Sequence, residues 1–446
     1  MSTPNKILIS LSVLLFISCD KNDDANPPST PTPEIQFVKT LGGSLNESAQ
    51  SIIKTNDGGY AIAGYTQSNN GDINDKTTEN FDYWFLKFDE NDNLQESKTF
   101  GGSESEKAHD IIQTNDGGFV LIGESNSNDG DITKTSDLDD IWIVKLDASG
   151  NIAWEKTHGF SGNDRAFSII QTADSGYFIS GILDVTASGG DGNDRSTKRK
   201  HAGGDYWGLK LDSNGDKIWR RYFGGTFTDT AFDAIETNDN GFIIIGSSDS
   251  EDVDISNNKG TYDYWVVKVN SNGDMVWEES YGGTQIDEAK GIVKTSDGNY
   301  LIVGNSRSND GDISNSKGAA DVWLIKISPS GDLIWEKSYG GSSFDSAEHI
   351  TPTQDGGYII TGNSRSEDKD LKNNEGQNDI WILKINNSGN LEWQKSIGGS
   401  NIDLAYSAIE LNDESIIVAG ESNSSDQFIE KNKGFADLLI TKIKTQ

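Results

Sequence analysis

The stretch that decides the fold is residues 281–335, YGGTQIDEAKGIVKTSDGNYLIVGNSRSNDGDISNSKGAADVWLIKISPSGDLIW. Four runs of strand character occur in and just after it: EAKGIVKT at 288–295, YLIVGN at 300–305, DVWLIKI at 321–327 and LIWEKSY at 333–339. The turn SDGN joins the first two runs and SPSGD joins the last two, and both have the Asp, Asn and Gly chemistry of tight hairpins. The stretch therefore predicts four antiparallel strands.

This unit of about 58 residues recurs along the chain, as a search for internal repeats shows. Seven copies begin at Gly42, Gly101, Gly159, Gly224, Gly282, Gly340 and Gly398. Four short strands per repeat, with no helical period in any copy, are typical of a propeller blade. We therefore predict an all-β fold, a seven-bladed β-propeller.

The two ends of the repeat array complement each other. The seventh copy stops at ADLLITKIKTQ and has only three strands. The missing strand is found at residues 35–40, IQFVKT, which align with IAWEKT at 152–157, so that Phe37 stands in the column of Trp154. We predict that this N-terminal strand completes the last blade and closes the ring, which removes its open edges.

The tryptophans fall into two columns of the repeat. Third-strand positions hold Trp84, Trp142, Trp207, Trp265, Trp323 and Trp381, and fourth-strand positions hold Trp154, Trp219, Trp277, Trp335 and Trp393. A role repeated in nearly every blade favours packing over sugar binding, so we assign these rings to the core.

The N-terminus predicts export. Lys6 precedes an apolar run at 7–17, which is too short for a membrane span of about 20 residues, and we interpret residues 1–18 as a cleaved signal peptide. The sequence FISC, ending at Cys19, resembles the lipobox of bacterial lipoproteins, with Phe16 where Leu is usual. The resemblance implies that Cys19 is acylated and begins the mature chain. Because it is the only Cys, disulfides and a thiol nucleophile are excluded from the folded body.

Residues 19–34 are rich in Pro, Asp, Asn, Ser and Thr, a composition that predicts a flexible tether before the propeller of residues 35–446. The acidic run DKNDD at 20–24 resembles the export tag of Bacteroidota surface lipoproteins. We therefore expect an outer-membrane lipoprotein exposed at the cell surface, with the periplasmic face as the alternative, and two acyl chains as its membrane anchor.

A further resemblance lies in the turn before the fourth strand. Asp147 and Gly150 precede Trp154 in DASGNIAW, a pattern similar to the tryptophan-docking repeat of PQQ-like propellers but one residue shorter in its turn. The whole of residues 35–446 resembles the propeller-repeat surface proteins of Bacteroidota, some of which are labelled bulb-type lectin-like. This resemblance implies the fold and leaves the function open.

The charge balance narrows the partners. With 71 acidic and 37 basic residues the net charge is −34, which argues against nucleic acid and anionic membrane surfaces as partners. Cations, sugars and basic protein surfaces remain. The 11 Trp, 13 Tyr and 17 Phe argue against disorder despite this charge.

The loops between the second and third strands carry acidic side chains at i and i+2, as in SNDGDITK. One column holds Asp129, Asp252, Asp310, Asp368 and Asp426, with Asn70 in the first copy, and the other holds Asp72, Asp131, Asp254, Asp312 and Asp370. Oxygen ligands in this arrangement are suited to calcium, which takes six to eight of them. Asx turns and solubility explain the same residues, so both interpretations stay open.

Two more acidic columns recur in all seven copies. The first, two residues before a constant Ala, holds Glu47, Glu106, Asp164, Asp229, Asp287, Asp345 and Asp403. It predicts either a carboxylate ring around the channel mouth or capping of backbone N–H groups, and we favour capping. The second, at the start of the third strand, holds Asp82, Asp140, Asp205, Asp263, Asp321, Asp379 and Asp437, to which we assign a structural role.

The third copy departs from the repeat through a longer loop, TASGGDGNDRSTKRKHAGG. It contains Lys198, Arg199, Lys200 and His201, the one dense basic run after the signal segment. This run predicts a contact with a carboxylate-rich ligand or partner, and a tolerated insertion is the equal alternative.

The sequence contains no recognisable catalytic pattern. The four His lack metal-ligand spacing, a G-x-S-x-G motif is missing, and the single Cys excludes the vicinal Cys pair of a quinoprotein. We expect a non-enzymatic, monomeric binding module that presents its acidic loop face to a glycan or protein and needs no cofactor, with calcium as an option. A polysaccharide lyase or glycosidase, and a purely structural or adhesive envelope protein, are the alternatives.

Overall fold

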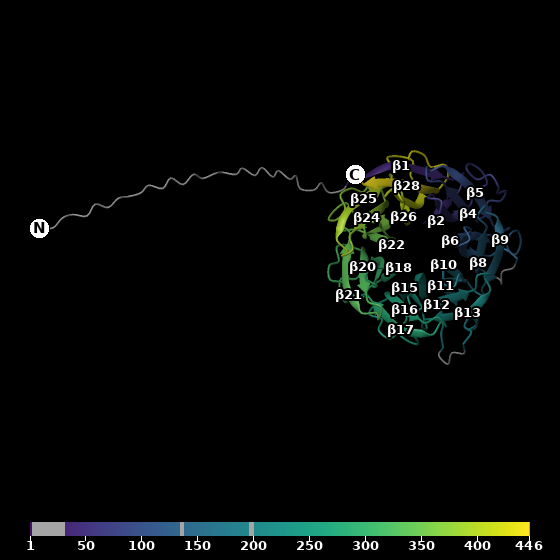
Figure 1. Cartoon of the computed structure of the whole chain (residues 1–446), viewed down its shortest axis with the longest axis horizontal. Helices are drawn as coiled ribbons and strands as arrows, with labels where there is room; N and C mark the ends of the chain where they lie inside the picture. The colour runs from purple at the N-terminus through teal and green to yellow at the C-terminus, as the bar shows by residue number, and fades with distance from the viewer. Residues whose placement is uncertain (2–31, 134–137, 196–199, 446) are drawn as a thin grey trace.

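The computed structural model describes residues 32–133, 138–195 and 200–445, together with Met1. Within them, 28 strands form seven four-stranded sheets set in a ring (Figure 1). All sheet neighbours are antiparallel, as in β2 with β3 (Glu47–Lys54 and Tyr60–Thr66). The predicted seven-bladed β-propeller is confirmed. The predicted signal peptide, Cys19 and nearly all of the tether lie outside the described residues.

In six blades the strands follow chain order from the channel outward. The first three blades contain β2, β3, β4 (Asp82–Phe88) and β5 (Leu94–Phe100); β6 (Glu106–Gln113), β7 (Phe119–Ser125), β8 (Asp140–Leu146) and β9 (Ile152–His158); and β10 (Arg165–Gln171), β11 (Tyr177–Asp184), β12 (Gly204–Leu211) and β13 (Lys217–Phe223). The next three contain β14 (Asp229–Glu236), β15 (Phe242–Ser248), β16 (Asp263–Val269) and β17 (Met275–Tyr281); β18 (Asp287–Lys294), β19 (Tyr300–Ser306), β20 (Asp321–Ile327) and β21 (Leu333–Tyr339); and β22 (Asp345–Pro352), β23 (Tyr358–Ser364), β24 (Asp379–Ile385) and β25 (Leu391–Ile397).

The seventh blade joins the two ends of the array. It consists of β26 (Asp403–Glu410), β27 (Ile416–Ser422), β28 (Asp437–Thr445) and, on its outside, β1 (Pro33–Leu41). β1 pairs antiparallel with β28 from Pro33 opposite Thr445 to Leu41 opposite Leu438. The register shifts between Ile35 and Phe37, just as it does at the matching place in other outer strands. The predicted closure by residues 35–40 is therefore confirmed.

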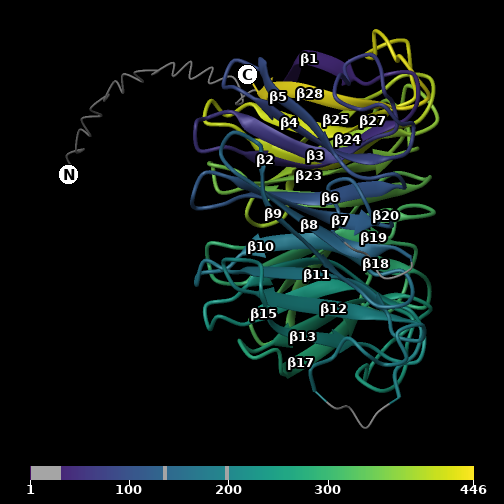
Figure 2. The same ribbon diagram turned by 90° about the vertical axis from the view of Figure 1, so that its right-hand side faces the viewer.

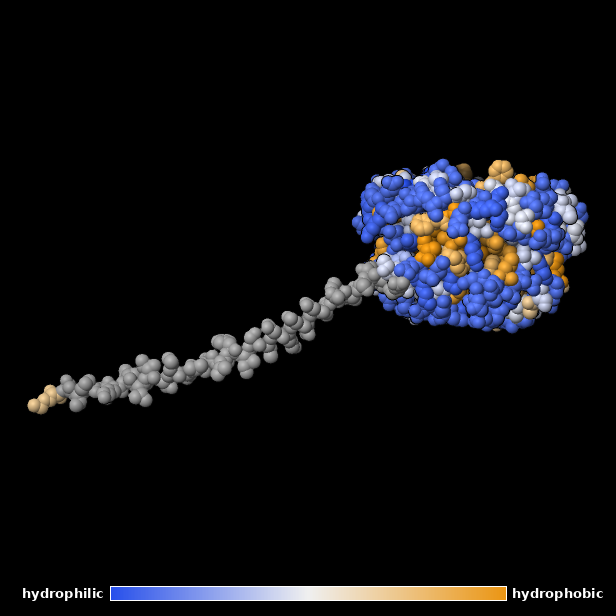
Figure 3. All heavy atoms as spheres, turned by 90° about the horizontal axis from the view of Figure 1, so that it is seen from above, coloured by the Kyte–Doolittle hydropathy of each residue, from blue (hydrophilic) through white to orange (hydrophobic). Residues whose placement is uncertain are grey.

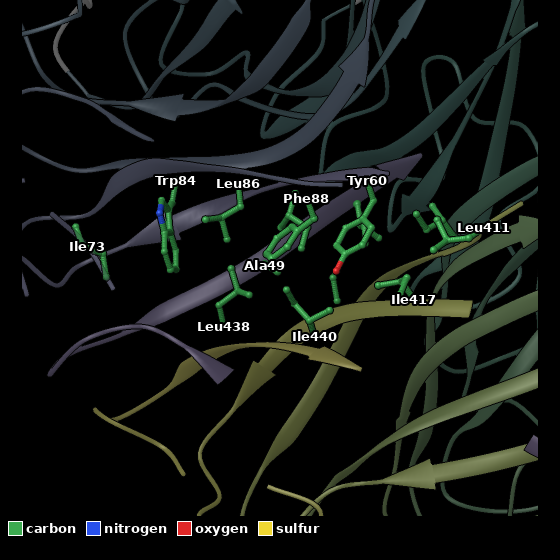
Figure 4. Close-up of a cluster of buried hydrophobic side chains, with 14 residues drawn as sticks. Ala49, Tyr60, Ile73, Trp84, Leu86, Phe88, Leu411, Ile417, Leu438 and Ile440 are labelled. Carbon is green, nitrogen blue, oxygen red and sulfur yellow. The ribbon is translucent and has the colours of Figure 1, made fainter. Parts of the chain in front are cut away.

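The core lies between the faces of neighbouring blades. Where the first and seventh blades meet, Trp84, Leu86 and Phe88 pack against Leu438 and Ile440 (Figure 4). All six third-strand tryptophans are at most 1% exposed, which confirms their packing role. Burying so much apolar surface against the next blade provides the main stabilisation of a ring whose blades are small sheets.

Buried tyrosines also join successive blades. The Tyr83 hydroxyl donates to the Trp142 carbonyl at 3.0 Å, and its ring lies 4.6 Å from that of Trp142. Three blades further on, Tyr264 repeats the arrangement with Trp323. These contacts fix the spacing of the blades around the ring.

From the side, the strands cross the ring between two faces that carry the loops (Figure 2). On the circumference, apolar side chains gather midway between hydrophilic rims (Figure 3). Ile218, Val276 and Ile334 on three successive outer strands are 47 to 57% exposed. Among the residues that the structure describes, no helix has the length and apolar character needed to cross a membrane.

Candidate functional site

The acidic pairs of the long loops bind the segment that enters the same blade. Asp129 accepts the Ser103 N–H at 2.7 Å, and Asp131 accepts the Gly101 N–H at 3.1 Å. Equivalent bonds to backbone N–H groups are made by Asp72, Asp252, Asp254, Asp310, Asp312, Asp368, Asp370 and Asp426. These side chains therefore hold each loop against the ring.

The calcium interpretation of these loop acids stays a prediction. Each acid has at least one backbone N–H partner, but this partner stands 26 or 30 residues earlier in the chain, so the bonds are long-range contacts and differ from the local Asx turns of the alternative interpretation. Within the described residues, no group of three or more His, Cys, Asp or Glu side chains is arranged to hold a metal ion.

The acids that begin the inner strands act as caps, and we call them the capping acids. Asp345 accepts the Gly341 N–H at 2.7 Å and the Ser366 hydroxyl at 2.8 Å. The backbone N–H four residues earlier is also bound by Glu47, Glu106, Asp164, Asp229, Asp287 and Asp403. All seven are 0% exposed, which excludes a carboxylate ring open to the channel and confirms the capping interpretation.

Each third-strand acid lies close to a capping acid of the next blade. Gly282 lies between Asp263 and Asp287, and a Cβ there would clash with a carboxylate oxygen of each. Burial raises the pKa of Asp263 to about 7, and the charge of Asp287 adds to this. Four residues before Asp263, Lys259 binds Asp312 and the Ser280 carbonyl, so it supplies positive charge at the junction.

Lys317 and Lys433 repeat the role of Lys259, with Asp370 and Asp72 as partners. Sequence reasoning missed this column of junction cations. The signal was present, because a Lys stands four residues before the third-strand Asp in these copies.

His201 occupies the same column in the third blade. Its Nδ1 lies 2.7 Å from Asp205 and its Nε2 lies 3.8 Å from Asp254, with its side chain 4% exposed. Burial acts to lower the pKa of His201, but Asp205 and the neighbouring acids outweigh it, and the pKa is raised. The structure thus places His201 at a blade junction.

The rest of the predicted basic run is placed differently. Lys200 is exposed, while Lys198 and Arg199 lie outside the described residues. His201 of the run lines a cavity of about 220 Å³, whose lining also includes Arg195, Arg221, Asp254 and Asp274. This lining carries both signs of charge, and the ligand predicted for the run remains untested.

A different site lies in the central channel, along which Figure 1 is viewed. Every inner strand has a β-bulge directly after its constant Ala, as between Ala49 and Ser51. A bulge opposes two residues to one on the partner strand and re-aims their side chains. The seven bulge residues are Gln50, His109, Phe167, Phe232, Lys290, Glu348 and Tyr406, and we call them the channel ring. All seven line one cavity of about 350 Å³.

The channel ring has an aromatic side and a polar side. Phe167 is flanked by His109 and Phe232, with ring centroids 5.2 and 5.5 Å away. In the next blade, the Lys290 ammonium lies 3.5 Å from the centroid of the Phe232 ring. Glu348 follows Lys290 in ring order, and burial raises its pKa, partly offset by the charge of Lys290.

The residues next to the channel ring hold the inner strands together. Asp110 accepts the Ser51 hydroxyl at 2.7 Å from the blade before it and the Ile169 N–H at 2.9 Å from the blade after it. Asp233 makes the same two bonds with Ser168 and Ile292. Burial raises the pKa of Asp110 to about 7 and that of Asp233 to about 6.

A charged network stands beside the aromatic side of the channel. Arg165 contacts Glu124 and Asp139, each at 2.7 Å, and His109 lies 3.5 Å from Glu124. Burial acts to raise the pKa of Glu124, but His109 and Arg165 outweigh it and the pKa is lowered. The two basic groups thus keep Glu124 ionised.

Sequence reasoning missed the channel ring. Its signal is the column after the constant Ala, which holds six different residues in seven copies, but the column before that Ala varies as much, so variability alone does not single out the channel ring. A position that the repeat does not constrain is free to serve a ligand.

The known proteins to which this chain is similar share little sequence with it. No protein family and no curated protein matches the chain. Among solved structures, a protein of unknown function from Dyadobacter fermentans is 11% identical with a TM-score of 0.48, covering 93% of this chain and 99% of that one. The WD40 domain of Neurospora crassa Pan2 is also 11% identical with a TM-score of 0.48, covering 92% and 96%. A Bacteroides vulgatus member of the DUF4221 family is 10% identical with a TM-score of 0.36, covering 93% and 98%.

Proposed function

We propose that this chain is a non-enzymatic binding module, held at the outer membrane through an acylated Cys19 and exposed at the cell surface. The observation that carries the binding function is the contrast between the channel ring and the repeated acidic columns. The seven blades share one repeat, yet they direct seven side chains of six different types into a single cavity. Their capping acids, by contrast, are all Asp or Glu and are buried. A cavity lined by a few polar groups and aromatic rings is the usual form of a small-molecule site.

The bonding of the channel acids supports binding without catalysis. A general acid or base needs an oxygen that reaches the substrate. Both oxygens of Asp110 accept protein donors, and so do both oxygens of Asp233. Glu348 is the one acid of the channel ring, and glycoside hydrolysis requires two carboxyl groups at a defined separation.

The binding function is tested on residues 20–446, which contain the whole ring. Thermal shift against a panel of monosaccharides, amino acids and nucleosides should reveal a stabilising ligand, because binding to the native state raises the melting temperature. Incubation with polysaccharides, followed by chromatography, should yield no shortened product. Product formation would replace this proposal with the lyase or glycosidase alternative, and the failure of every compound to bind would favour a structural role.

The membrane anchor has its own test. Labelled fatty acid should enter the wild-type chain in bacteria and should not enter the Cys19→Ser variant. Equal labelling of both would remove the anchor from the proposal. Protease added to intact cells should then digest the ring if it faces outward.

A further inference from the structure

We propose that the central channel binds one uncharged pyranose ring, which packs on Phe167 and is hydrogen-bonded from the side of Lys290 and Glu348. This inference depends on the proposed function, because it names the ligand of the same site. The observations that support it are the asymmetry of the channel ring, the charges of its members and the size of the cavity.

The aromatic side suits a sugar. Phe167 is partly exposed although it lies at the centre of the ring of blades, and its neighbours His109 and Phe232 extend an apolar surface across three successive blades. The ring C–H groups of a pyranose form an apolar face that gains dispersion energy against such a surface. One face of Phe232 is covered by the Lys290 ammonium, which leaves Phe167 as the main platform.

The opposite side supplies the polar contacts that sugar hydroxyls require. Lys290 offers donors and Glu348 offers acceptors. Gln50 offers both, with one amide N–H already donated to Ser48. Tyr406, whose hydroxyl donates to Glu421, offers an acceptor. Hydroxyl groups that leave water need such partners, because an unpaired buried hydroxyl costs free energy. Free amino acids also present donors and acceptors, but they lack the apolar face that the ring C–H groups of a pyranose form.

The charges favour a neutral ligand over an acidic sugar. Lys290 and Glu348 compensate each other, and the ammonium of Lys290 is already held over the Phe232 ring. Asp110 and Asp233 lie in the same cavity lining and would repel a carboxylate whenever they are ionised. The volume of about 350 Å³ is near the lower end of ligand cavities, which span about 300 to 1,000 Å³, and fits one sugar ring better than a length of polysaccharide.

The test uses saturation-transfer NMR and calorimetry on residues 20–446. The probes are the methyl glycosides of glucose, mannose, galactose and N-acetylglucosamine, with glucuronic acid as the acidic comparison. At least one neutral glycoside should bind, with the strongest saturation on the C–H protons of one ring face. Its affinity should stay constant between about 50 and about 500 mM NaCl, because no net charge is involved.

The decisive variant is Phe167→Ala, with Phe227→Ala as its matched control. Phe227 lies on the connection between β13 and β14 and is 60% exposed. Phe167→Ala should weaken binding about tenfold or more, and Phe227→Ala should leave it unchanged, with equal melting temperatures showing that both variants fold. Lys290→Met should weaken a neutral sugar less than Phe167→Ala does, whereas an anionic ligand would show the reverse order.

The outcomes separate this inference from the broader proposal. Glycoside binding that survives Phe167→Ala would place the sugar elsewhere and overturn the inference. Binding of an amino acid or nucleoside alone, lost in Phe167→Ala, would also overturn it while leaving the channel as a ligand site. If no compound in either panel binds, both proposals fail.

Discussion

In strand β22, Asp345 and Glu348 lie three residues apart and belong to two different regions of the molecule. Asp345 is a capping acid, fully buried and bonded to a backbone N–H and two hydroxyls, and every blade has its equivalent. Glu348 is a member of the channel ring, whose position holds Gln, His, Phe, Lys or Tyr in the other blades. A repeat protein can thus keep its stability in the repeated columns while the residues that line its channel differ from blade to blade.

The largest expected effect comes from breaking the ring itself. Deleting residues 33–41 removes β1, leaves β28 with an open edge and uncovers the cluster against which Phe37 and Leu41 pack. We expect a loss of at least about 5 kcal/mol in unfolding free energy, since single large core truncations cost about 3 to 5. Denaturant unfolding measures it, and an unchanged midpoint would show that the closure contributes little.

The comparison within β22 is tested directly by the pair Asp345→Ala and Glu348→Gln. The first leaves buried N–H and hydroxyl groups without an acceptor, and we expect it to cost about 2 to 4 kcal/mol. The second changes a side chain that faces the channel and should stay within about 0.5 kcal/mol. Urea unfolding of the two variants side by side gives both values. Equal losses would remove the distinction between the two regions.

A smaller effect is expected from pH. Burial raises the pKa of Asp263 to about 7 from its ordinary 3.8, so the folded state binds the proton more tightly than the unfolded state. The resulting stabilisation is complete below the unfolded pKa and is lost as the pH rises through about 7. Burial also raises the pKa of the capping acid Asp164 and of the third-strand acid Asp379. The melting temperature should therefore be higher near about pH 5.5 than near about pH 8.5.

The pair Asp263→Asn and Asp332→Asn separates this linkage from general charge repulsion. Above about pH 7 both remove one charge, but Asp332 lies in an exposed hairpin turn. Because Asn mimics the protonated acid, Asp263→Asn should reduce the pH-dependent loss of stability by about 1 to 2 kcal/mol. Asp332→Asn should not reduce it, and matching curves for the two variants would assign the pH effect to net charge alone.

The smallest effect is expected from calcium at the loop acids. Because Asp129 and Asp131 already accept backbone N–H groups, calcium and sodium at equal ionic strength should raise the melting temperature equally by screening. A rise specific to calcium, abolished by Asp129→Asn with Asp131→Asn, would establish metal sites there.

Much of the fold could be predicted from the residues. The strands predicted at 300–305 and 321–327 match β19 and β20 to within one residue, because alternating side chains and hairpin turns are local signals. Closure also could be predicted, since a three-stranded last copy and a lone first strand complement each other. Capping by the repeated acids followed from their strict period.

The channel ring could not be located in the same way. Whether the residue after a constant Ala points into the channel depends on the bulge, which a continuous strand pattern does not reveal. His201 is a second example, since its role became visible once the ring had brought Asp254 of the next blade beside it.

The sequence by itself determined the number of blades, the order of their strands, the buried columns and the partner of the N-terminal strand, because each depends on spacing and on hydrophobic pattern. The tertiary structure alone decided which side chains meet. Phe167, Phe232 and Lys290 are about 60 residues apart in the chain, and they share one cavity only because the closed ring places the same position of every blade on a common axis.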